Sequence, residues 1–265
     1  MKSVLITGAG TGLGQATADY LSGKGYQVFG LVNRHDDIKD PKVIKIHTDI
    51  TSDESVKACY EEVIKHTDHL DAIVNFAGYR QRGSLIEEDV SLRQKTLNVN
   101  VLGRYRINKT FFSLVEKVKG RIINISSECG IFGATPFNGF YTASKHAVER
   151  YSDALRRELC YLGVKVIKIR PGAFKTNRVK STQPIFDKRV EKTTHYKGLL
   201  ERFGTMINSN TGKVKDPNEL AKLIEKVLTK KKPKIAYNIN VSFSRKRRNI
   251  FSDNRQDKLY RSVIK

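Results

Sequence analysis

The chain has 265 residues, 39% of them hydrophobic and 29% charged, and its 49 Lys and Arg against 27 Asp and Glu give a net charge of +22. This length and apolar content suit one large α/β domain or two small ones and exclude a disordered, collagen-like or coiled-coil chain. The basic excess is uneven, because residues 1–132 carry a net +2 and residues 133–265 a net +20. The basic excess therefore lies almost entirely in the second half of the chain.

We expect the chain to carry no signal for export or membrane insertion. The apolar stretch after Lys2 ends at Ile6, and no window approaches the roughly 18 apolar residues of a membrane helix. Cys59, Cys129 and Cys160 lack metal-ligand spacing and are expected to be reduced, mostly buried thiols. We therefore expect a cytoplasmic protein with no disulfide and no metal site.

Short runs rich in Val, Ile and Leu alternate with helix-length amphipathic segments. The alternation lapses after Thr176 and resumes at Asp216. Such a pattern predicts an α/β fold with a doubly wound parallel sheet of about seven strands, a Rossmann fold in three layers. The expected strands are 2–7, 27–32, 43–47, 72–75, 121–126, 164–170 and 234–243, and the expected helices are 13–24, 53–66, 101–119, 142–161 and 217–228.

We find no internal repeat and no interdomain linker, so residues 1–265 are expected to form a single domain. A long insertion in a compact domain is more often functional than idle, and residues 177–215 are expected to form a lid over a substrate. Residues 244–265 are expected to form a basic tail.

A glycine-rich loop, residues 7–14, joins the first expected strand to the first expected helix. Glycines there let backbone N–H groups approach a pyrophosphate at the positive end of the helix. The literal G-x-G-x-x-G is absent because Leu13 occupies the place of its last glycine. Such a loop can be no more than a turn, but its position between strand and helix favours a dinucleotide site.

The end of the second expected strand carries Asn33 and Arg34, with no carboxylate before Asp36. An acidic residue there would bind the ribose 2′-hydroxyl of NAD, whereas an arginine accommodates the 2′-phosphate of NADP. We therefore predict NADP(H) as the preferred cofactor, bound through Arg34, without excluding NAD(H). The alternative is that Arg34 is a solvated loop residue.

Tyr141 and Lys145 stand four residues apart, which places them on one face of a helix. A tyrosine is a poor base near neutrality, and an adjacent ammonium improves it by stabilising the phenolate. The pair suits proton exchange with a carbonyl or alcohol oxygen. Because this spacing is common by chance, its weight depends on the motifs around it.

Several motifs resemble those of the short-chain dehydrogenase/reductase family, over residues 2 to about 176. Residues 75–78, Asn-Phe-Ala-Gly, are similar to its N-N-A-G, with Phe76 departing at the second position. Asp49 and Ile50 match its D-[VI] pair, whose acidic side chain contacts adenine. Residues 171–176 match its P-G-x-x-x-T, which meets the nicotinamide.

Two further matches supply the remaining chemical groups. Residues 127–130 match the family's S-x-x-G and residues 100–103 its N-x-x-G. Ser127 precedes Tyr141 by 14 residues, one more than is usual, so the loop near residues 134–136 must absorb an extra residue. As an alternative, Asn98 or Asn100 could only cap or kink a helix.

The resemblance implies a role for each group. Ser127 would polarise the substrate carbonyl and Tyr141 would exchange the proton. Lys145 would bond the nicotinamide ribose and assist Tyr141, and Asn100 would hold a water that links Lys145 to solvent. The residues expected to contact the cofactor are Gly8, Gly10, Thr11, Gly12, Leu13, Gly14, Arg34, Asp49, Ile50, Asn75, Ala77, Gly78, Tyr141, Lys145, Pro171, Gly172 and Thr176.

Neither the substrate nor the assembly follows directly from these residues. Residues 136–140 resemble the hydroxysteroid and retinol dehydrogenase branch, with mostly apolar substrates, whereas the expected lid is polar and basic. The basic clusters 230–234 and 245–248 could meet nucleic acid or an anionic membrane, but a solvated surface is favoured. The family commonly pairs subunits through the helices that carry Asn100 and Tyr141, so a homodimer or homotetramer is expected.

The sequence thus predicts an NADP(H)-dependent carbonyl reductase or alcohol dehydrogenase that acts on a small molecule. The alternative is a cofactor-binding regulatory or anionic-surface-binding protein with little turnover. A complete Asn, Ser, Tyr and Lys set favours the enzyme.

Overall fold

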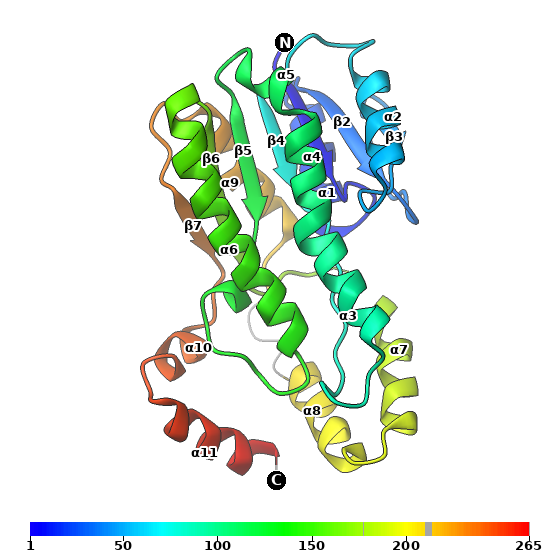
Figure 1. Ribbon diagram of the computed structural model, residues 1–265, viewed down its shortest axis with the longest axis vertical. Helices are drawn as coiled ribbons and strands as arrows, with labels where there is room; N and C mark the ends of the chain where they lie inside the picture. Colours follow the sequence, from blue (N-terminus) through cyan, green and yellow to red (C-terminus); the bar gives the residue numbers. More distant parts are fainter. Residues whose placement is uncertain (177, 210–213, 265) are drawn as a thin grey trace.

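The computed structural model describes residues 1–176, 178–209 and 214–264. Within these ranges a seven-stranded sheet runs in the order β3-β2-β1-β4-β5-β6-β7, with every pair parallel (Figure 1). The predicted doubly wound sheet is confirmed. The strands are β1 (Ser3–Thr7), β2 (Gln27–Val32), β3 (Ile44–His47), β4 (Ala72–Asn75), β5 (Arg121–Ile125), β6 (Lys165–Pro171) and β7 (Ala236–Ile239).

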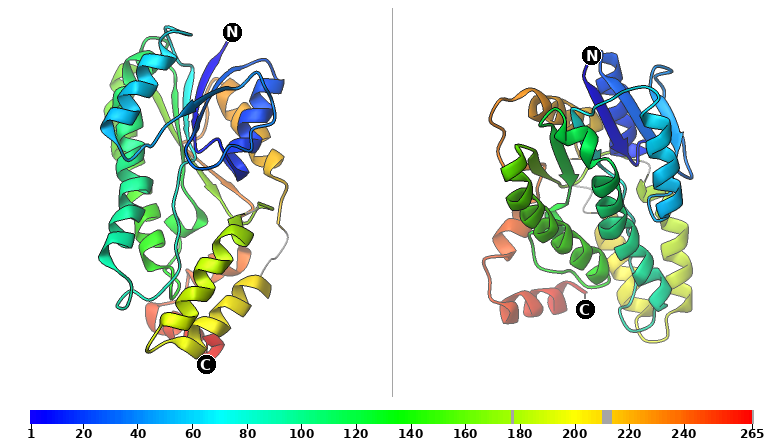
Figure 2. Two further views of the ribbon diagram at one scale, coloured as in Figure 1. Left: turned by 90° about the vertical axis from the view of Figure 1, so that its right-hand side faces the viewer. Right: turned by 45° about the horizontal axis from the view of Figure 1, so that its top comes forward.

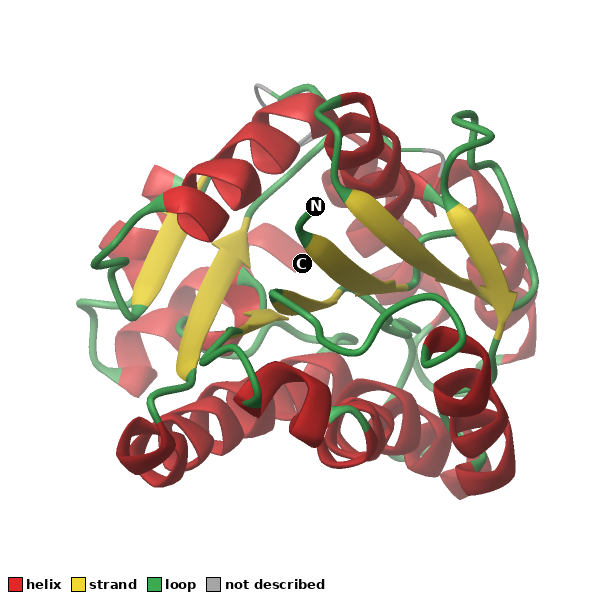
Figure 3. Cartoon of the chain, turned by 90° about the horizontal axis from the view of Figure 1, so that it is seen from above, coloured by secondary structure: helices red, strands yellow, loops and turns green. Residues whose placement is uncertain are grey.

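Helices cover both faces of the sheet (Figures 2 and 3). α1 (Gly12–Gly23) and α9 (Pro217–Thr229) lie on one face, and α2 (Asp53–Val63), α4 (Gly103–Thr110) and α6 (Gly139–Leu159) lie on the other. Successive strand residues point to opposite faces. Val4 and Ile6 therefore join one buried core and Leu5 the other, which explains the uninterrupted apolar runs of the strands.

The order of the strands fixes where a ligand can bind. The chain moves from β1 to β3 on one side and then crosses back to β4 on the other side of β1. In open parallel sheets, ligands bind beyond the carboxyl ends of the strands at such a switch point. The site should therefore lie where β1 and β4 end.

The single helix predicted over residues 101–119 is wrong. The segment begins earlier, at α3 (Val90–Leu97), passes through one π-helical stretch, η1 (Asn98–Leu102), and continues as α4 and α5 (Phe112–Glu116). Asp89 caps α3 by accepting the N–H of Ser91 at 2.7 Å. The π-helical turn shifts the helical register, so one uniform period does not describe the segment.

The strand–helix alternation is expected to be interrupted over residues 177–215. The described part of this segment contains two helices, α7 (Arg178–Lys192) and α8 (Lys197–Ser209). Pro184 inside α7 and the frequent basic residues obscure the helical period. Phe186, Leu200 and Phe203 form a small core of their own between them. Residues 177 and 210–213 of the expected lid lie outside the described residues.

The end of the chain also differs from expectation. β7 is shorter than the predicted 234–243, because Asn240 adopts a positive φ of +52° and Ser242 caps a new helix, α10 (Phe243–Arg248). α11 (Asp253–Ile264) follows, so the expected tail is helical. Figure 1 shows α10 and α11 beyond the carboxyl edge of the sheet, as α7 and α8 are. Lys265 lies outside the described residues.

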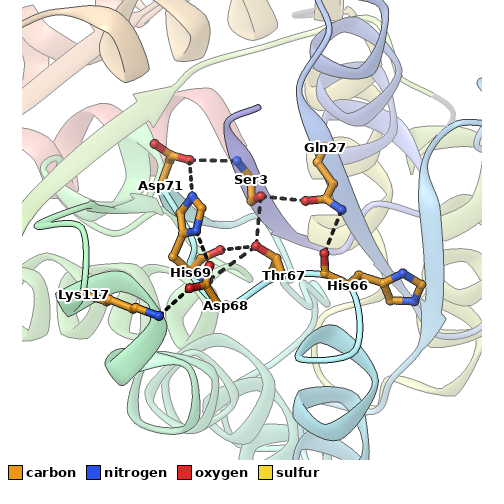
Figure 4. Close-up of polar contacts among 8 residues, drawn as sticks. All are labelled: Ser3, Gln27, His66, Thr67, Asp68, His69, Asp71 and Lys117. Atoms are coloured by element: carbon orange, nitrogen blue, oxygen red, sulfur yellow. Dashed lines mark hydrogen bonds and ion pairs between the residues drawn. The ribbon is translucent and has the colours of Figure 1, made fainter.

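At the opposite, amino-terminal edge, polar side chains bond to one another (Figure 4). The N–H of Ser3 donates to Asp71 Oδ2 at 2.8 Å, and Ser3 Oγ donates to Gln27 Oε1 at 2.7 Å. Hydrogen bonds from His69 and Lys117 lower the pKa of Asp68 to about 2. These contacts fasten the start of β1 to its neighbours.

No helix in the described ranges is long and apolar enough to cross a bilayer.

Candidate functional site

The predicted tyrosine and lysine lie near the start of α6, beside the carboxyl end of β5. Lys145 Nζ lies 5.7 Å from the centre of the Tyr141 ring and donates to the carbonyl oxygen of Ile125 at 3.1 Å. Both side chains are buried. The ammonium is therefore held beside the phenol by the backbone of β5.

Ser127 lies two residues after the end of β5 and caps a short 3-10 helix, η2 (Glu128–Gly130), with its Oγ accepting the N–H of Cys129 at 3.1 Å. A Cβ on Gly130 would lie 3.0 Å from the backbone oxygen of Lys145, closer than real side chains approach with ease. The glycine of the S-x-x-G motif thus lets the serine segment pack on α6. The loop before α6, which is expected to absorb the extra residue, contains Phe137 at a φ of +57°.

Asn100 lies inside the π-helical turn η1 and is fully buried. Its Oδ1 accepts the backbone N–H of Tyr79 at 2.6 Å. Its Nδ2 donates to the backbone oxygen of Tyr79 at 2.9 Å and to Ser144 Oγ at 2.8 Å. A Cβ on Gly78 would lie 3.4 Å from Asn100 Oδ1 and 3.9 Å from Lys145 Nζ. The structure thus brings Asn100, Lys145 and the end of the N-F-A-G segment together.

Arg104 is a buried cation beside the site that sequence reasoning missed. Its guanidinium donates to the backbone oxygens of Asn100 at 2.6 Å, Ile125 at 3.2 Å and Asn75 at 3.3 Å. Burial lowers its pKa to about 10, so it stays charged at neutral pH. Arg104 and Lys145 therefore share the carbonyl of Ile125. The only signal in the sequence is its place directly after N-x-x-G.

The amino-terminal end of α1 fits a cofactor pyrophosphate. Thr11 caps α1 without a side-chain hydrogen bond and the first turn has no acidic residue, whereas Ser52, Asp89 and Asp216 cap their helices with side chains. The first-turn N–H groups of α1 thus have no side-chain cap, an arrangement that can bind an anion.

The end of the P-G-x-x-x-T segment reaches the same loop. Gly12 has a positive φ of +60°, and a Cβ there would lie 3.6 Å from Thr176 Cγ2. Gly172 holds the base of that segment, because its N–H donates to the oxygen of Ile239 at 2.9 Å. Thr176 is therefore placed next to the expected pyrophosphate position.

Two residues predicted to touch the cofactor turn their side chains into the protein. Asn75 Nδ2 donates to Asn108 Oδ1 at 2.9 Å and to Asn124 Oδ1 at 3.0 Å. The Ile50 side chain packs against Gly103, where a Cβ would lie 2.7 Å from Ile50 Cδ1. Cofactor contacts through the backbones of Asn75 and Ile50 stay predictions.

Arg34 and Asp49 lie at the expected adenine end, after β2 and β3. Burial raises the pKa of the Asp49 carboxyl, but hydrogen bonds from Thr51 and the positive charges of Arg34 and Lys95 outweigh it and hold that pKa below its usual range. Arg34 is exposed. Arg34 and Asp49 thus lie near enough to each other for the charge of Arg34 to stabilise the Asp49 carboxylate.

Helices α7 and α8 are tied to the loop that leads from β4 to α3. Arg189 pairs with Glu88 at 3.1 Å and donates to the oxygen of Arg82. Glu87 accepts the Thr193 hydroxyl at 2.5 Å and the N–H of His195 at 2.8 Å. The expected lid is therefore anchored beside the site, and its role as a lid stays a prediction.

The carboxyl-terminal segment folds onto the serine segment. Glu128 accepts the N–H of Ser242 at 2.8 Å and pairs with Arg245 at 3.4 Å, and Arg245 donates to Cys129 Sγ at 3.1 Å. The expectation that cluster 245–248 is solvated is therefore wrong for Arg245.

The cysteines are free, as expected, but only two of them are buried. Cys59 and Cys129 are buried, whereas Cys160 is exposed. Burial raises the pKa of the Cys59 thiol to about 11.

Comparison with known proteins gives consistent results. Residues 2–186 match the family model described as short chain dehydrogenase. The 3-ketodihydrosphingosine reductase of Bacteroides thetaiotaomicron is 38% identical over 65% of this chain and 64% of its own length. Estradiol 17-beta-dehydrogenase 2 of Mus musculus is 33% identical over 80% of this chain and 56% of its own length. The chain thus spans less than two thirds of these relatives.

A solved structure shares the fold. Actinorhodin polyketide ketoreductase, crystallised with NADPH, superposes with a TM-score of 0.74 and is 24% identical over 90% of this chain and 95% of its own.

Proposed function

The chain belongs to the short-chain dehydrogenase family, and from this premise we propose that it transfers hydride between NADP(H) and a carbonyl or alcohol substrate. One observation carries the proposal: the fold brings Asn100, from η1, beside the α6 segment that carries Tyr141 and Lys145, at the carboxyl end of β5, and Ser127 follows that same strand. A protein that only bound the cofactor would not need all four groups.

Each group has a role that follows from its chemistry. The bound cofactor supplies or accepts the hydride. The Ser127 hydroxyl donates to the substrate oxygen, and the Tyr141 hydroxyl gives that oxygen its proton in reduction or takes it in oxidation. Lys145, held by the carbonyl of Ile125, keeps a positive charge beside the ring that becomes anionic.

Arg104 adds a second fixed cation and limits how Asn100 can act. Both N–H groups of the Asn100 amide are engaged, its Oδ1 accepts the N–H of Tyr79, and its backbone oxygen accepts one hydrogen bond from Arg104. A carbonyl oxygen has a second lone pair. We place the proposed water that links Lys145 to solvent on that lone pair.

The cofactor would be held along the edge of the sheet. The first-turn N–H groups of α1 would bind the pyrophosphate, Asp49 the adenine, and Thr176 the nicotinamide carboxamide. The choice of NADP(H) rests on Arg34, with no carboxylate at the end of β2. The NADPH of the polyketide ketoreductase is consistent with this choice.

Arg34→Ala tests the cofactor preference. Because a charge-assisted contact to a phosphate contributes about 1.5–3 kcal/mol, the Kd for NADPH should rise about 10- to 100-fold while that for NADH stays within about twofold. Fluorescence titration with both cofactors measures the ratio. Lys57→Ala, which removes the same charge from the exposed side of α2, is the matched control. An unchanged NADPH to NADH ratio in Arg34→Ala would assign Arg34 to the solvated loop instead.

The oxidoreductase proposal itself is tested by following NADPH absorbance with a panel of ketones, aldehydes, steroids and sugars. Turnover of at least one class that is lost in Tyr141→Phe supports it. A silent panel from protein that binds NADPH would favour the regulatory alternative.

We also propose a homodimer or homotetramer, formed through the helices that carry Asn100 and Tyr141. Leu97, Leu102 and Tyr105 leave apolar surface exposed along α3, η1 and α4, which suits such a contact. Light scattering should give two or four times the chain mass of 30.1 kDa, and Tyr105→Asp should lower that value. A monomer at assay concentration would contradict the proposal.

A further inference from the structure

Arg80 holds a second positive charge against the proposed proton donor. It lies two residues after Gly78, in the loop that leads from β4 to α3. Its Cζ is 5.4 Å from the centre of the Tyr141 ring, about as close as the 5.7 Å of Lys145 Nζ. A guanidinium over an aromatic ring is attracted to the ring face, which fixes its position. The half-buried side chain thus reaches the place where the substrate must sit.

Nearby carboxylates do not neutralise this guanidinium. Within the three described ranges of the chain, Arg80 forms no ion pair. Glu88, in the same loop, pairs with Arg189, and Glu128, after Ser127, pairs with Arg245. These two carboxylates are therefore already paired with other arginines, and Glu87, in the same loop, accepts hydrogen bonds from Thr193 and from the N–H of His195.

The surroundings of Tyr141 are consequently rich in positive charge. Lys145 and the buried Arg104 both donate to the carbonyl oxygen of Ile125. Together with Arg80 they place three cations around the Tyr141 ring. A site lined by one sign of charge attracts a ligand of the other sign.

The anions of the cofactor are assigned elsewhere. Its pyrophosphate would meet the start of α1, and its 2′-phosphate would meet Arg34. Arg80 lies instead over the ring that would exchange a proton with the substrate. An anion on Arg80 would therefore belong to the substrate.

We infer that the substrate carries a carboxylate or phosphate group, which Arg80 binds while the substrate carbonyl meets Ser127 and Tyr141. This inference rests on the proposed oxidoreductase function. Arginine suits the role because its planar fork can give a carboxylate or phosphate two hydrogen bonds at once. Arg80 would thus select a charged oxo compound over the apolar substrates that residues 136–140 suggested.

Paired substrates test the inference, because each pair differs in the anion alone. Acetoacetate and 4-oxopentanoate are compared with their methyl esters, and dihydroxyacetone phosphate with dihydroxyacetone. The carboxylate and phosphate arms distinguish the two sources of charge. The protein should prefer the charged member of at least one pair by about 10- to 100-fold in kcat/KM, the range of a charge-assisted contact.

Arg80→Met retains most of the side-chain stem and removes the charge. It should erase the preference by lowering kcat/KM for the charged member while leaving that for the neutral member within about twofold. Arg80→Lys should retain part of the preference, because it keeps the charge and loses the fork. Arg150→Ala is the matched control, since Arg150 lies on α6 with its side chain 77% exposed.

A binding measurement separates this inference from the proposed function. In Tyr141→Phe, which keeps the ring under Arg80, calorimetry with bound NADP⁺ gives the Kd of each substrate without turnover. A preference for the charged member that disappears with Arg80→Met supports the inference even if no substrate is turned over, in which case only the proposed function fails. Equal binding of both members in every pair, or an equal loss for both in Arg80→Met, overturns the inference.

Discussion

Tyr141→Phe is expected to lower kcat by about 10²- to 10⁴-fold, the usual contribution of a positioned general acid or base. The substitution removes only the hydroxyl that would exchange the proton. The ring remains, so the packing of Lys145 and Arg80 around it should persist. The Kd for NADPH should stay within about twofold, because the proposed cofactor contacts lie mainly on other residues.

The matched control for that loss is Tyr151→Phe, on the same helix. Tyr151 is half-buried, and its hydroxyl accepts a hydrogen bond from Asn108 at 3.0 Å. Its loss should reduce stability by about 1 kcal/mol and leave kcat nearly unchanged. Steady-state kinetics, NADPH titration and thermal unfolding of both variants provide the comparison. Full activity in Tyr141→Phe would remove Tyr141 from the mechanism.

Glu149→Gln is expected to lower the free energy of unfolding by about 3–5 kcal/mol, the range found when one partner of a buried ion pair is removed. The Glu149 side chain is fully buried and accepts two hydrogen bonds from Arg170, at 2.9 and 2.7 Å. Lys168 Nζ lies 3.2 Å from the same carboxylate. An amide would leave the buried Lys168 and the half-buried Arg170 without that charge, although Lys168 also pairs with Asp153 at 2.5 Å.

Chemical denaturation measures the change, and Glu158→Gln is its control, because Glu158 is exposed on the same helix.

The ion pairs of Glu149 also bear on the position of Lys145 in the site. Glu149 stands four residues after Lys145 and so on the same face of α6, which its ion pairs fasten to β6. Loss of stability without any change in activity would show that this fastening does not position Lys145.

The pH dependence of stability should identify the same carboxylate. Burial raises the pKa of Glu149, but hydrogen bonds from Arg170 and the charges of Arg170 and Lys168 outweigh it, so the pKa lies below the ordinary 4.5. A carboxyl whose pKa is lower in the folded state stabilises the fold above its ordinary pKa, and this contribution is lost as the pH falls through the folded-state value. The free energy of unfolding should therefore decrease as the pH drops below about 4.5. This decrease should be less steep in Glu149→Gln. Equal slopes in both proteins would contradict this assignment.

Local pattern was enough to predict much of the fold. Val4, Leu5 and Ile6 form part of an uninterrupted apolar run, which a strand buried on both faces requires. The helical spacing of Tyr141 and Lys145 is likewise a local property. The pattern failed for residues 101–119, where a π-helical turn changes the period, and for residues 177–215, where Pro184 and basic residues conceal two helices.

The sequence by itself determined the seven strands, the helices α1, α2, α6 and α9, the glycine-rich loop and the motifs of the family, because these depend on residues close together in the chain. Only the tertiary structure decided which distant groups the arginine side chains contact. Arg104 bonds to Ile125, 21 residues away, and Arg245 bonds to Cys129, 116 residues away. Whether a charge is solvated, paired or placed over a reactive ring depends on which distant segments the topology brings beside it. Three of the arginines that contribute to the net charge of +22, Arg80, Arg104 and Arg245, therefore lie in or beside the site.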